Sequence, residues 1–226
     1  MTREEKAGHI LQSSGLLEHL AEYGTPHIVG SCRMDMMAWN DIDIDIENDG
    51  MALEKLHRLT GFVVDTFRPF WYEAKEVVDD EGKKVWFQGF EARIDGERWN
   101  FDLWFFDRET IEKAEALCDG IAARATPAQR ESITEIKRGL IARGLYSFEK
   151  FHSMDVYKAV LEENIRTRGP HKDCTIHSEA KGALPLPQRK GDMQNGKVRP
   201  KITARRGIHP RRGDTGDPGL RGSKQG

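Results

Sequence analysis

The chain has 226 residues with 38% hydrophobic and 32% charged side chains and a formal net charge of -2, and this length predicts one ordinary domain or one domain with an appendage. No apolar run approaches the roughly 20 residues that cross a bilayer, which argues against a membrane protein. The first residues lack the apolar run of a secretory signal. Three scattered cysteines without a CxxC pair favour neither a disulfide framework nor a zinc site, so we expect a cytoplasmic location.

The small net charge combines two unlike segments. Residues 169–226 carry 13 Lys and Arg against 5 Asp and Glu, whereas residues 1–168 carry 22 basic and 32 acidic side chains. The C-terminal segment also holds 10 Gly and 6 Pro and no aromatic residue. A segment with so little apolar surface has little to offset its ordering entropy. We therefore expect a folded acidic body followed by a disordered basic tail.

Hydrophobic periodicity and turn residues predict the elements of the body in chain order. Two strands between two helices come first, at residues 2–23 (helix), 27–30 (strand), 41–47 (strand) and 51–67 (helix). A meander of strands follows, with Asp95-Gly96 as a hairpin turn, at residues 71–78, 85–94 and 98–106. Three helical patterns close the body, at residues 108–125, 127–143 and 153–166.

These elements predict an α/β (α+β) fold class. We expect a mixed, largely antiparallel sheet flanked by helices, then a small helical C-terminal region and the disordered tail. The expected boundaries divide the chain into residues 1–107, 108–168 and 169–226.

The segment from residue 28 to residue 46 carries the clearest chemical signal. A short apolar strand ends in Gly30-Ser31, nine residues intervene, and an acidic strand, DIDIDIE, begins at Asp41. Glycine lets a backbone amide approach a phosphate closely, and the serine hydroxyl can donate to a phosphate oxygen. Alternate strand residues share a face, so Asp41 and Asp43 lie about 7 Å apart at Cα. Two such carboxylates repel each other unless a cation lies between them, and Mg²⁺ is the natural candidate.

This arrangement resembles the nucleotidyltransferases related to DNA polymerase beta. Their pattern of an apolar residue, Gly, Gly or Ser, a spacer, and Asp-apolar-Asp-apolar is matched by Val29-Gly30-Ser31 and Asp41-Ile42-Asp43-Ile44. The family also uses a third carboxylate on a later strand, and Asp102 in RWNFDLWFF is the matching position. The resemblance covers roughly residues 15–110, and the flanking segments look like those of small bacterial, minimal-type members.

The resemblance implies phosphoryl transfer with two Mg²⁺ ions and a nucleotidyltransferase catalytic domain at residues 1–107. Asp41 and Asp43 would hold the ions, and Asp102 would hold the second ion and help to deprotonate an acceptor hydroxyl. Such a transfer depends mainly on positioning and charge neutralisation. The residues expected to bind the triphosphate are Gly30, Ser31 and Arg33, although Arg33 could equally be an ordinary surface arginine.

Three other interpretations of the acidic strand are open. The metal pair could be Asp43 and Asp45, but we prefer Asp41 and Asp43 because they lie closer to the Gly-Ser turn. The strand could be a solvated acidic edge strand, since edge charges discourage aggregation. A calcium-binding loop that starts at Asp43 is disfavoured, because Asn48 stands where that loop needs glycine.

Several neighbouring residues have a functional and a structural interpretation. Trp39 and Trp104 could stack on a base, although core packing is the simpler expectation. Lys137 and Arg138 could reach the triphosphate, although a charged helix surface is the simpler expectation. Cys32 is expected to be a small buried residue and not a nucleophile.

The predicted reaction moves a nucleoside monophosphate from a nucleoside triphosphate, preferably ATP, to an acceptor hydroxyl. The acidic body shows no basic track, so a small molecule, particularly a cationic one, is favoured over a nucleic acid as acceptor. Transfer to protein or RNA is an alternative. So is a non-catalytic nucleotide-binding or antitoxin-like regulatory module. We expect no membrane partner, and the sequence leaves the oligomeric state open.

Overall fold

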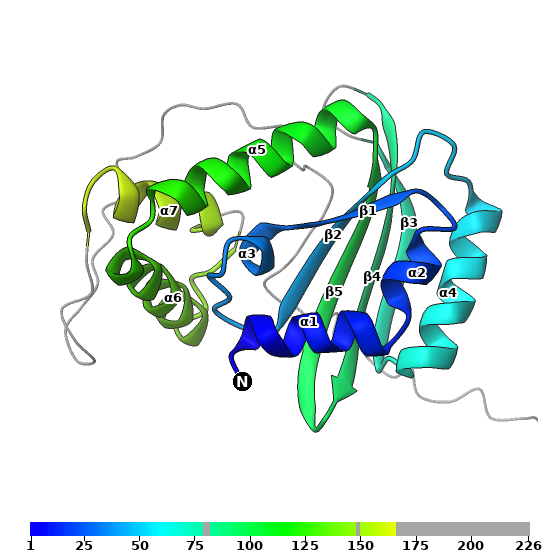
Figure 1. Cartoon of the computed structure of the whole chain (residues 1–226), viewed down its shortest axis with the longest axis horizontal. Coiled ribbons are helices and arrows are strands. Elements are labelled where there is room, and N and C mark those ends of the chain that lie inside the picture. Colours follow the sequence, from blue (N-terminus) through cyan, green and yellow to red (C-terminus); the bar gives the residue numbers. More distant parts are fainter. Residues whose placement is uncertain (79–81, 148–149, 166–226) are drawn as a thin grey trace, which may run out of the picture. The chain divides into compact units, whose positions relative to one another are not determined.

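The computed structural model describes residues 1–78, 82–147 and 150–165, so the predicted tail lies outside the described residues (Figure 1). Within them, five strands form one sheet in the order β1-β2-β5-β4-β3. The strands are β1 (Thr25–Val29), β2 (Asp41–Glu47), β3 (Trp71–Val78), β4 (Lys84–Ile94) and β5 (Glu97–Phe106). β2 and β5 are parallel and the other neighbouring pairs are antiparallel. The mixed sheet expected from the sequence is therefore confirmed.

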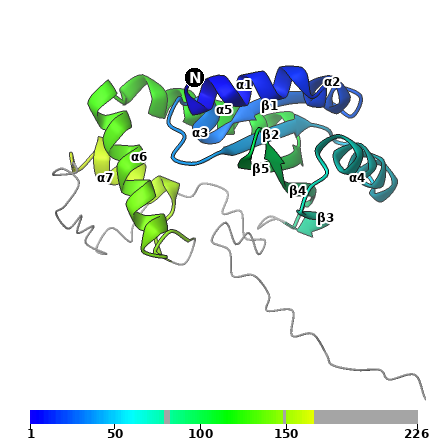
Figure 2. The same cartoon turned by 90° about the horizontal axis from the view of Figure 1, so that it is seen from below.

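Helices flank both faces of this sheet. In the described part of the chain they are α1 (Arg3–Ser13), α2 (Leu16–Leu20), α3 (Gly30–Arg33), α4 (Leu53–Phe67), α5 (Arg108–Arg124), α6 (Pro127–Ala142) and α7 (Ser153–Leu161). Helices α1, α2 and α4 pack on one face, and α5 packs on the other (Figures 1 and 2). α6 and α7 pack against each other, away from α4. None of the helices in the described ranges is long and apolar enough to cross a bilayer.

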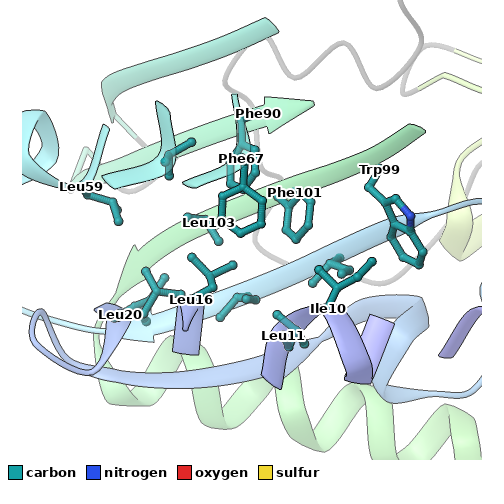
Figure 3. Packing of buried hydrophobic residues seen from close by; sticks show 14 of the residues in the cluster. Ile10, Leu11, Leu16, Leu20, Leu59, Phe67, Phe90, Trp99, Phe101 and Leu103 are labelled. Atoms are coloured by element: carbon teal, nitrogen blue, oxygen red, sulfur yellow. The ribbon is translucent and has the colours of Figure 1, made fainter. Parts of the chain in front are cut away.

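The apolar face of the sheet forms the larger core. The isoleucines of β2 and the large side chains of β5 point into it, beneath α1, α2 and α4. At its centre, the rings of Phe90 and Phe101 are stacked with their centroids 4.4 Å apart, and Phe67 of α4 lies against both (Figure 3). Truncating such a buried aromatic residue typically costs roughly 3–5 kcal/mol. This apolar layer therefore stabilises the strand pairing, and the strand pairing in turn fixes where the acids on the opposite face of the sheet lie.

The opposite face carries the acids of β2 and has apolar patches of its own. Trp104 lies between Phe87 and Phe106, with ring centroids 4.6 and 5.5 Å away, and these rings pack with Ile111 of α5. Core packing of Trp104 is therefore observed. Because β2 lies between β1 and β5, it is not an edge strand, and the interpretation of DIDIDIE as a solvated edge is wrong. Its regular pairing also contradicts a calcium-binding loop.

The differences from the sequence expectation that affect the site or the length of a helix lie at three places in the chain. The single helix expected at residues 2–23 is divided, because Gly15 adopts the left-handed conformation with φ of 70° between α1 and α2. The first strand ends at Val29, since Gly30 already begins α3. The last helix ends at Leu161 and not at residue 166.

Candidate functional site

One row of residues across β1, β2 and β5 joins the predicted glycine to two of the predicted acids. Val29, which precedes Gly30, is the Cα partner of Asp43, and Asp43 is the Cα partner of Asp102. Directly opposed residues project on the same face of a sheet, and neighbouring strands lie about 4.8 Å apart. The structure therefore brings together residues that are far apart in the sequence.

Gly30 is in direct contact with one of these acids. Its φ of +64° lies in the left-handed region, and a Cβ built there would lie 2.2 Å from Oδ2 of Asp43. The Asp43 carboxylate thus lies against Cα of the glycine, and any side chain at this position would displace it. Ser31 follows in the same helical turn, at the exit from β1.

Asp41 lies one step earlier on the same face of β2 and is only 5% exposed. The side-chain amide of Asn100 donates to Oδ1 of Asp41 at 2.7 Å and to Oδ1 of Asp102 at 3.2 Å. Burial, reinforced by the negative charge of Asp102, raises the pKa of Asp41 to about 7, although the Asn100 hydrogen bond and the charge of Lys137 act in the opposite direction. The site therefore favours a bound cation, which would stabilise the ionised carboxylates.

The carboxylate oxygens of Asp41, Asp43 and Asp102 are ligands that suit magnesium. Mg²⁺ prefers oxygen ligands and is usually held by one or two carboxylates, with phosphates and water completing its shell. Across residues 1–78, 82–147 and 150–165, no group of three or more acidic, His or Cys side chains is already arranged around one ion position. Asp41, Asp43 and Asp102 would therefore complete a metal site together with the phosphates of a bound nucleotide.

Asp45, the alternative ligand, lies further along the same face. It is fully buried, and its Cα partners are His27 on β1 and Trp104 on β5. Asp41 and Asp43 instead lie opposite Asn100 and Asp102. We therefore keep Asp41 and Asp43 as the predicted metal pair.

Lys137 of α6 is a buried cation close to this site. Its side chain is 1% exposed, its Nζ donates to the hydroxyl of Tyr157 at 2.8 Å, and Nζ lies 5.8 Å from the ring centroid of Trp39. Burial lowers the pKa of Lys137 to about 8, while the charges of Asp41 and Asp43 oppose this effect. The expectation of a charged helix surface is therefore wrong for Lys137.

The sequence did contain a signal for this burial. Lys137 lies at helical spacing within the buried stripe of α6, which contains Ile133, Ile136 and Leu140. Its neighbour Arg138 is placed differently, because its Nε donates to the backbone carbonyl of Ala38 at 3.1 Å. Arg138 thus links α6 to the segment that leads into β2.

Arg33 is engaged by acids of α5. Its Nε and Nη2 donate to the two carboxylate oxygens of Asp119 at 2.8 and 3.0 Å, and its Nη1 donates to Glu115 at 2.8 Å. A phosphate contact would require part of this network to open, and it stays a prediction. The neighbouring thiol of Cys32 has its pKa raised to about 12, first by burial and then by the charge of Asp43. Cys32 is therefore protonated near neutral pH and unsuited to nucleophilic attack.

Comparison with protein-family models finds no match, and no curated protein matches the sequence. Among solved structures, the fold is similar to a cytoplasmic RNA terminal U-transferase (13% identity, TM-score 0.45) and to the Cid1 poly(U) polymerase with Mg and 3'-dATP bound (13% identity, TM-score 0.48). It is also similar to the non-canonical poly(A) polymerase complex GLD-2–GLD-3 (15% identity, TM-score 0.49).

Each of these matches covers 70% of this chain and, in the same order, 46%, 48% and 51% of the other chain. The protein thus spans about half the length of the solved structures that it resembles. All three TM-scores are below 0.5.

Proposed function

We propose that this protein is a Mg²⁺-dependent nucleotidyltransferase. It would transfer a nucleoside monophosphate from a nucleoside triphosphate to an acceptor hydroxyl, with release of pyrophosphate. The observation that carries the proposal is the adjacency of Gly30, Asp43 and Asp102: the Asp43 carboxylate lies against Cα of the glycine, and Asp43 is the Cα partner of Asp102. The residues predicted to bind phosphate, to bind metal and to act as base are thereby neighbours, which supports the proposal because phosphoryl transfer depends mainly on positioning.

The acids would bind the nucleotide through magnesium, and the Gly30-Ser31 turn would bind it directly. Asp41 and Asp43 would hold two Mg²⁺ ions, with Asp102 sharing the second. When bound, magnesium would supply charge neutralisation at the transferring phosphate. The backbone of Gly30 and the hydroxyl of Ser31 would hold the triphosphate.

Lys137 would add a further positive charge opposite the nucleotide. It is buried near Asp41 and Asp43 and does not lie on the solvent-exposed side of α6. An ammonium group at this place would help to neutralise the negative charge that the triphosphate brings.

The chemical step is a displacement at the α-phosphorus. The acceptor oxygen forms a bond to this phosphorus, the bond to the bridging oxygen breaks, and pyrophosphate leaves with the electron pair. Asp102 would accept the proton of the acceptor hydroxyl. The Asn100 amide, which contacts Oδ1 of both Asp102 and Asp41, would keep the base oriented.

We propose ATP as the donor and a small molecule as the acceptor. The excess of acidic residues in residues 1–168 supports a small acceptor, because it would repel a long polyanion. The free thiols of Cys32 and Cys118 suit the reducing cytoplasm, where ATP and Mg²⁺ are also supplied.

The test is incubation of the whole chain with each labelled nucleoside triphosphate, Mg²⁺ and a panel of hydroxyl acceptors, with pyrophosphate release as the readout. Asp43→Asn is expected to reduce the rate by at least about 100-fold, because it removes a charged metal ligand. Asp95→Asn is the matched control. This residue is exposed in the β4–β5 turn with φ of 51°, a conformation that asparagine also tolerates, so the rate should not change.

Two results would contradict the proposal. One is an undiminished rate in Asp43→Asn. The other is tight nucleotide binding that is indifferent to Mg²⁺ and gives no pyrophosphate with any acceptor, since this outcome would favour a non-catalytic binding module. Both are read from the same preparations, by activity assay and by calorimetry.

A further inference from the structure

A second row of paired residues runs from the predicted metal site to the edge of the sheet at β3 (Figure 1). Asp41 pairs with Asn100 on β5, Asn100 pairs with Glu91 on β4, and Glu91 pairs with Trp71 on β3. Because opposed residues share a face, Trp71 lies on the same face as Asp41. The row ends on an accessible aromatic side chain, since Trp71 is 42% exposed.

The indole of Trp71 lies over a glycine beside the predicted base. A Cβ built at Gly89 would lie 3.4 Å from Cη2 of Trp71 and 2.5 Å from Cζ of Phe87. Gly89 is the Cα partner of Asp102, on a strand about 4.8 Å away. The two rings therefore cover the sheet next to Asp102, and the glycine leaves the space that they occupy.

Two arginines and a third aromatic residue, Phe70, lie beside Trp71 and Glu91. Arg98 forms an ion pair with the buried carboxylate of Glu91, and its guanidinium lies 5.3 Å from the ring centroid of Phe70. Phe70 is 51% exposed, and its backbone N–H donates to the carbonyl of Glu91 at 3.0 Å. Arg93, the Cα partner of Arg98, is also exposed. The solvent side of this group thus presents arginines and aromatic rings, while its carboxylate is buried.

The two sides of the acidic row differ in what they can bind. On the β1 side, the Gly30-Ser31 turn adjoins Asp43, and the triphosphate would bind there. On the β4 side, aromatic rings adjoin Asp102, which would take the proton of the acceptor. The attacking and leaving oxygens are roughly in line at the phosphorus, so the acceptor must approach from the side away from the leaving pyrophosphate.

We propose that Phe70, Trp71, Arg93 and Arg98, together called the acceptor platform, bind the acceptor substrate. This acceptor is a small molecule with a flat ring that stacks on Trp71 and a phosphate or carboxylate that pairs with the arginines. The inference rests on the proposed nucleotidyltransferase function. It replaces the cationic acceptor expected from composition, because Arg93 and Arg98 together outweigh the one carboxylate of Glu91 that pairs with Arg98, and the remaining positive charge repels a cation.

The test is calorimetric titration of the whole chain after its nucleotide site has been saturated with Mg²⁺ and a non-hydrolysable ATP analogue. AMP serves as the probe, since it carries a flat ring and a phosphate. Trp71→Ala is expected to raise the Kd of AMP by at least about tenfold, a typical effect of losing one aromatic stacking partner. Trp71→Phe retains most of the affinity. Arg93→Gln weakens the binding of AMP but not that of uncharged adenosine.

Tyr72→Ala is the matched control. Tyr72 is the next residue on β3, is 52% exposed and points to the opposite face, so its loss should leave the Kd of AMP unchanged. Thermal stabilisation by Mg²⁺ and the ATP analogue should be retained in Trp71→Ala. This readout separates a failure of the acceptor platform from a failure of the nucleotide site.

Several outcomes would overturn the proposal. They are no binding of AMP to the wild-type chain, an unchanged Kd in Trp71→Ala, and tighter binding of an aminoglycoside than of AMP. Displacement of AMP by far lower concentrations of a single-stranded oligonucleotide, with steep salt dependence, would assign the surface to nucleic acid instead.

Discussion

At Gly30, the absence of a side chain determines where the Asp43 carboxylate can lie. The backbone there is left-handed, and the Asp43 carboxylate occupies the space that a Cβ would take. The sequence motif predicts that glycine is needed for a phosphate. The structure adds a second reason, because the same glycine accommodates the neighbouring acid. Asp41 depends similarly on its surroundings, since burial and Asp102 raise its pKa to about 7.

An alanine at Gly30 would have two effects, backbone strain and a clash with Asp43, and an alanine at Gly15 would have only the first. Gly30→Ala places a methyl group against Asp43 and is expected to reduce activity by roughly 100-fold, the scale of loss when a catalytic group is displaced by about 1 Å. Gly15→Ala introduces comparable backbone strain, since Gly15 has φ of +70°, but a Cβ there meets nothing within 4 Å. Both variants should lose about 1–2 kcal/mol of stability in urea unfolding. Equal activity in the two variants would contradict the role assigned to Gly30.

Elements with a strong local pattern are predicted well. β2 occupies residues 41–47 as expected, because isoleucine and aspartate alternate along it. α6 begins at Pro127 as expected, with a capping box between Thr126 and Gln129. The helix expected at residues 2–23 shows the limit of such patterns. Its apolar spacing continues across Gly15, but the left-handed backbone at that residue divides it.

The N-terminus of helix α5 provides a test of how a helix cap contributes to stability. Asp107 accepts a hydrogen bond from the backbone N–H of Thr110 at 2.7 Å and forms an ion pair with Lys83. The hydrogen bond from Lys83 is the larger cause, and that from Thr110 the next, of a pKa of Asp107 lowered to about 2. Asp107→Ala is expected to reduce the free energy of unfolding by about 1 kcal/mol at pH 7.

The direction of the pH effect follows from this lowered pKa. The folded pKa lies below the ordinary value of 3.8, so the stabilisation is present above about pH 4 and is lost as the pH falls towards 2. The difference in stability between wild type and Asp107→Ala should therefore shrink markedly as the pH falls from 4 to 2 in urea unfolding. Asp107→Asn, which keeps an acceptor oxygen without the charge, should lie between them at pH 7. A gap of the same size at both pH values would rule out the charged cap.

At the scale of the whole molecule, the site is assembled from distant parts of the chain. Asp43 and Asp102 meet through the parallel pairing of β2 and β5, although one helix, α4, and two strands, β3 and β4, separate these strands in sequence. Lys137 of α6, within the region predicted at residues 108–168, is near enough for the charges of Asp41 and Asp43 to act on its pKa. A nucleotide bound there would engage both predicted regions at once.

Such a ligand should stabilise the entire fold by mass action. At a free concentration of 100 times its Kd, a non-hydrolysable ATP analogue with Mg²⁺ is expected to add about 2.7 kcal/mol, which raises Tm by several degrees in a protein of this size. Differential scanning fluorimetry should show this shift in wild type and in Asp95→Asn but not in Asp43→Asn. Chelation of Mg²⁺ should abolish it. A full shift without the metal would contradict the assigned roles of Asp41 and Asp43.

Local patterns in the sequence are enough to predict the strand of alternating isoleucine and aspartate, the Gly30-Ser31 turn and the meander that carries Asp102. Which of these residues meet depends on the tertiary packing. It buried Lys137, paired Arg33 with α5 and laid Trp71 over Gly89. These facts depend on packing between segments far apart in the chain, and local periodicity carries no information about the partner that a side chain will find.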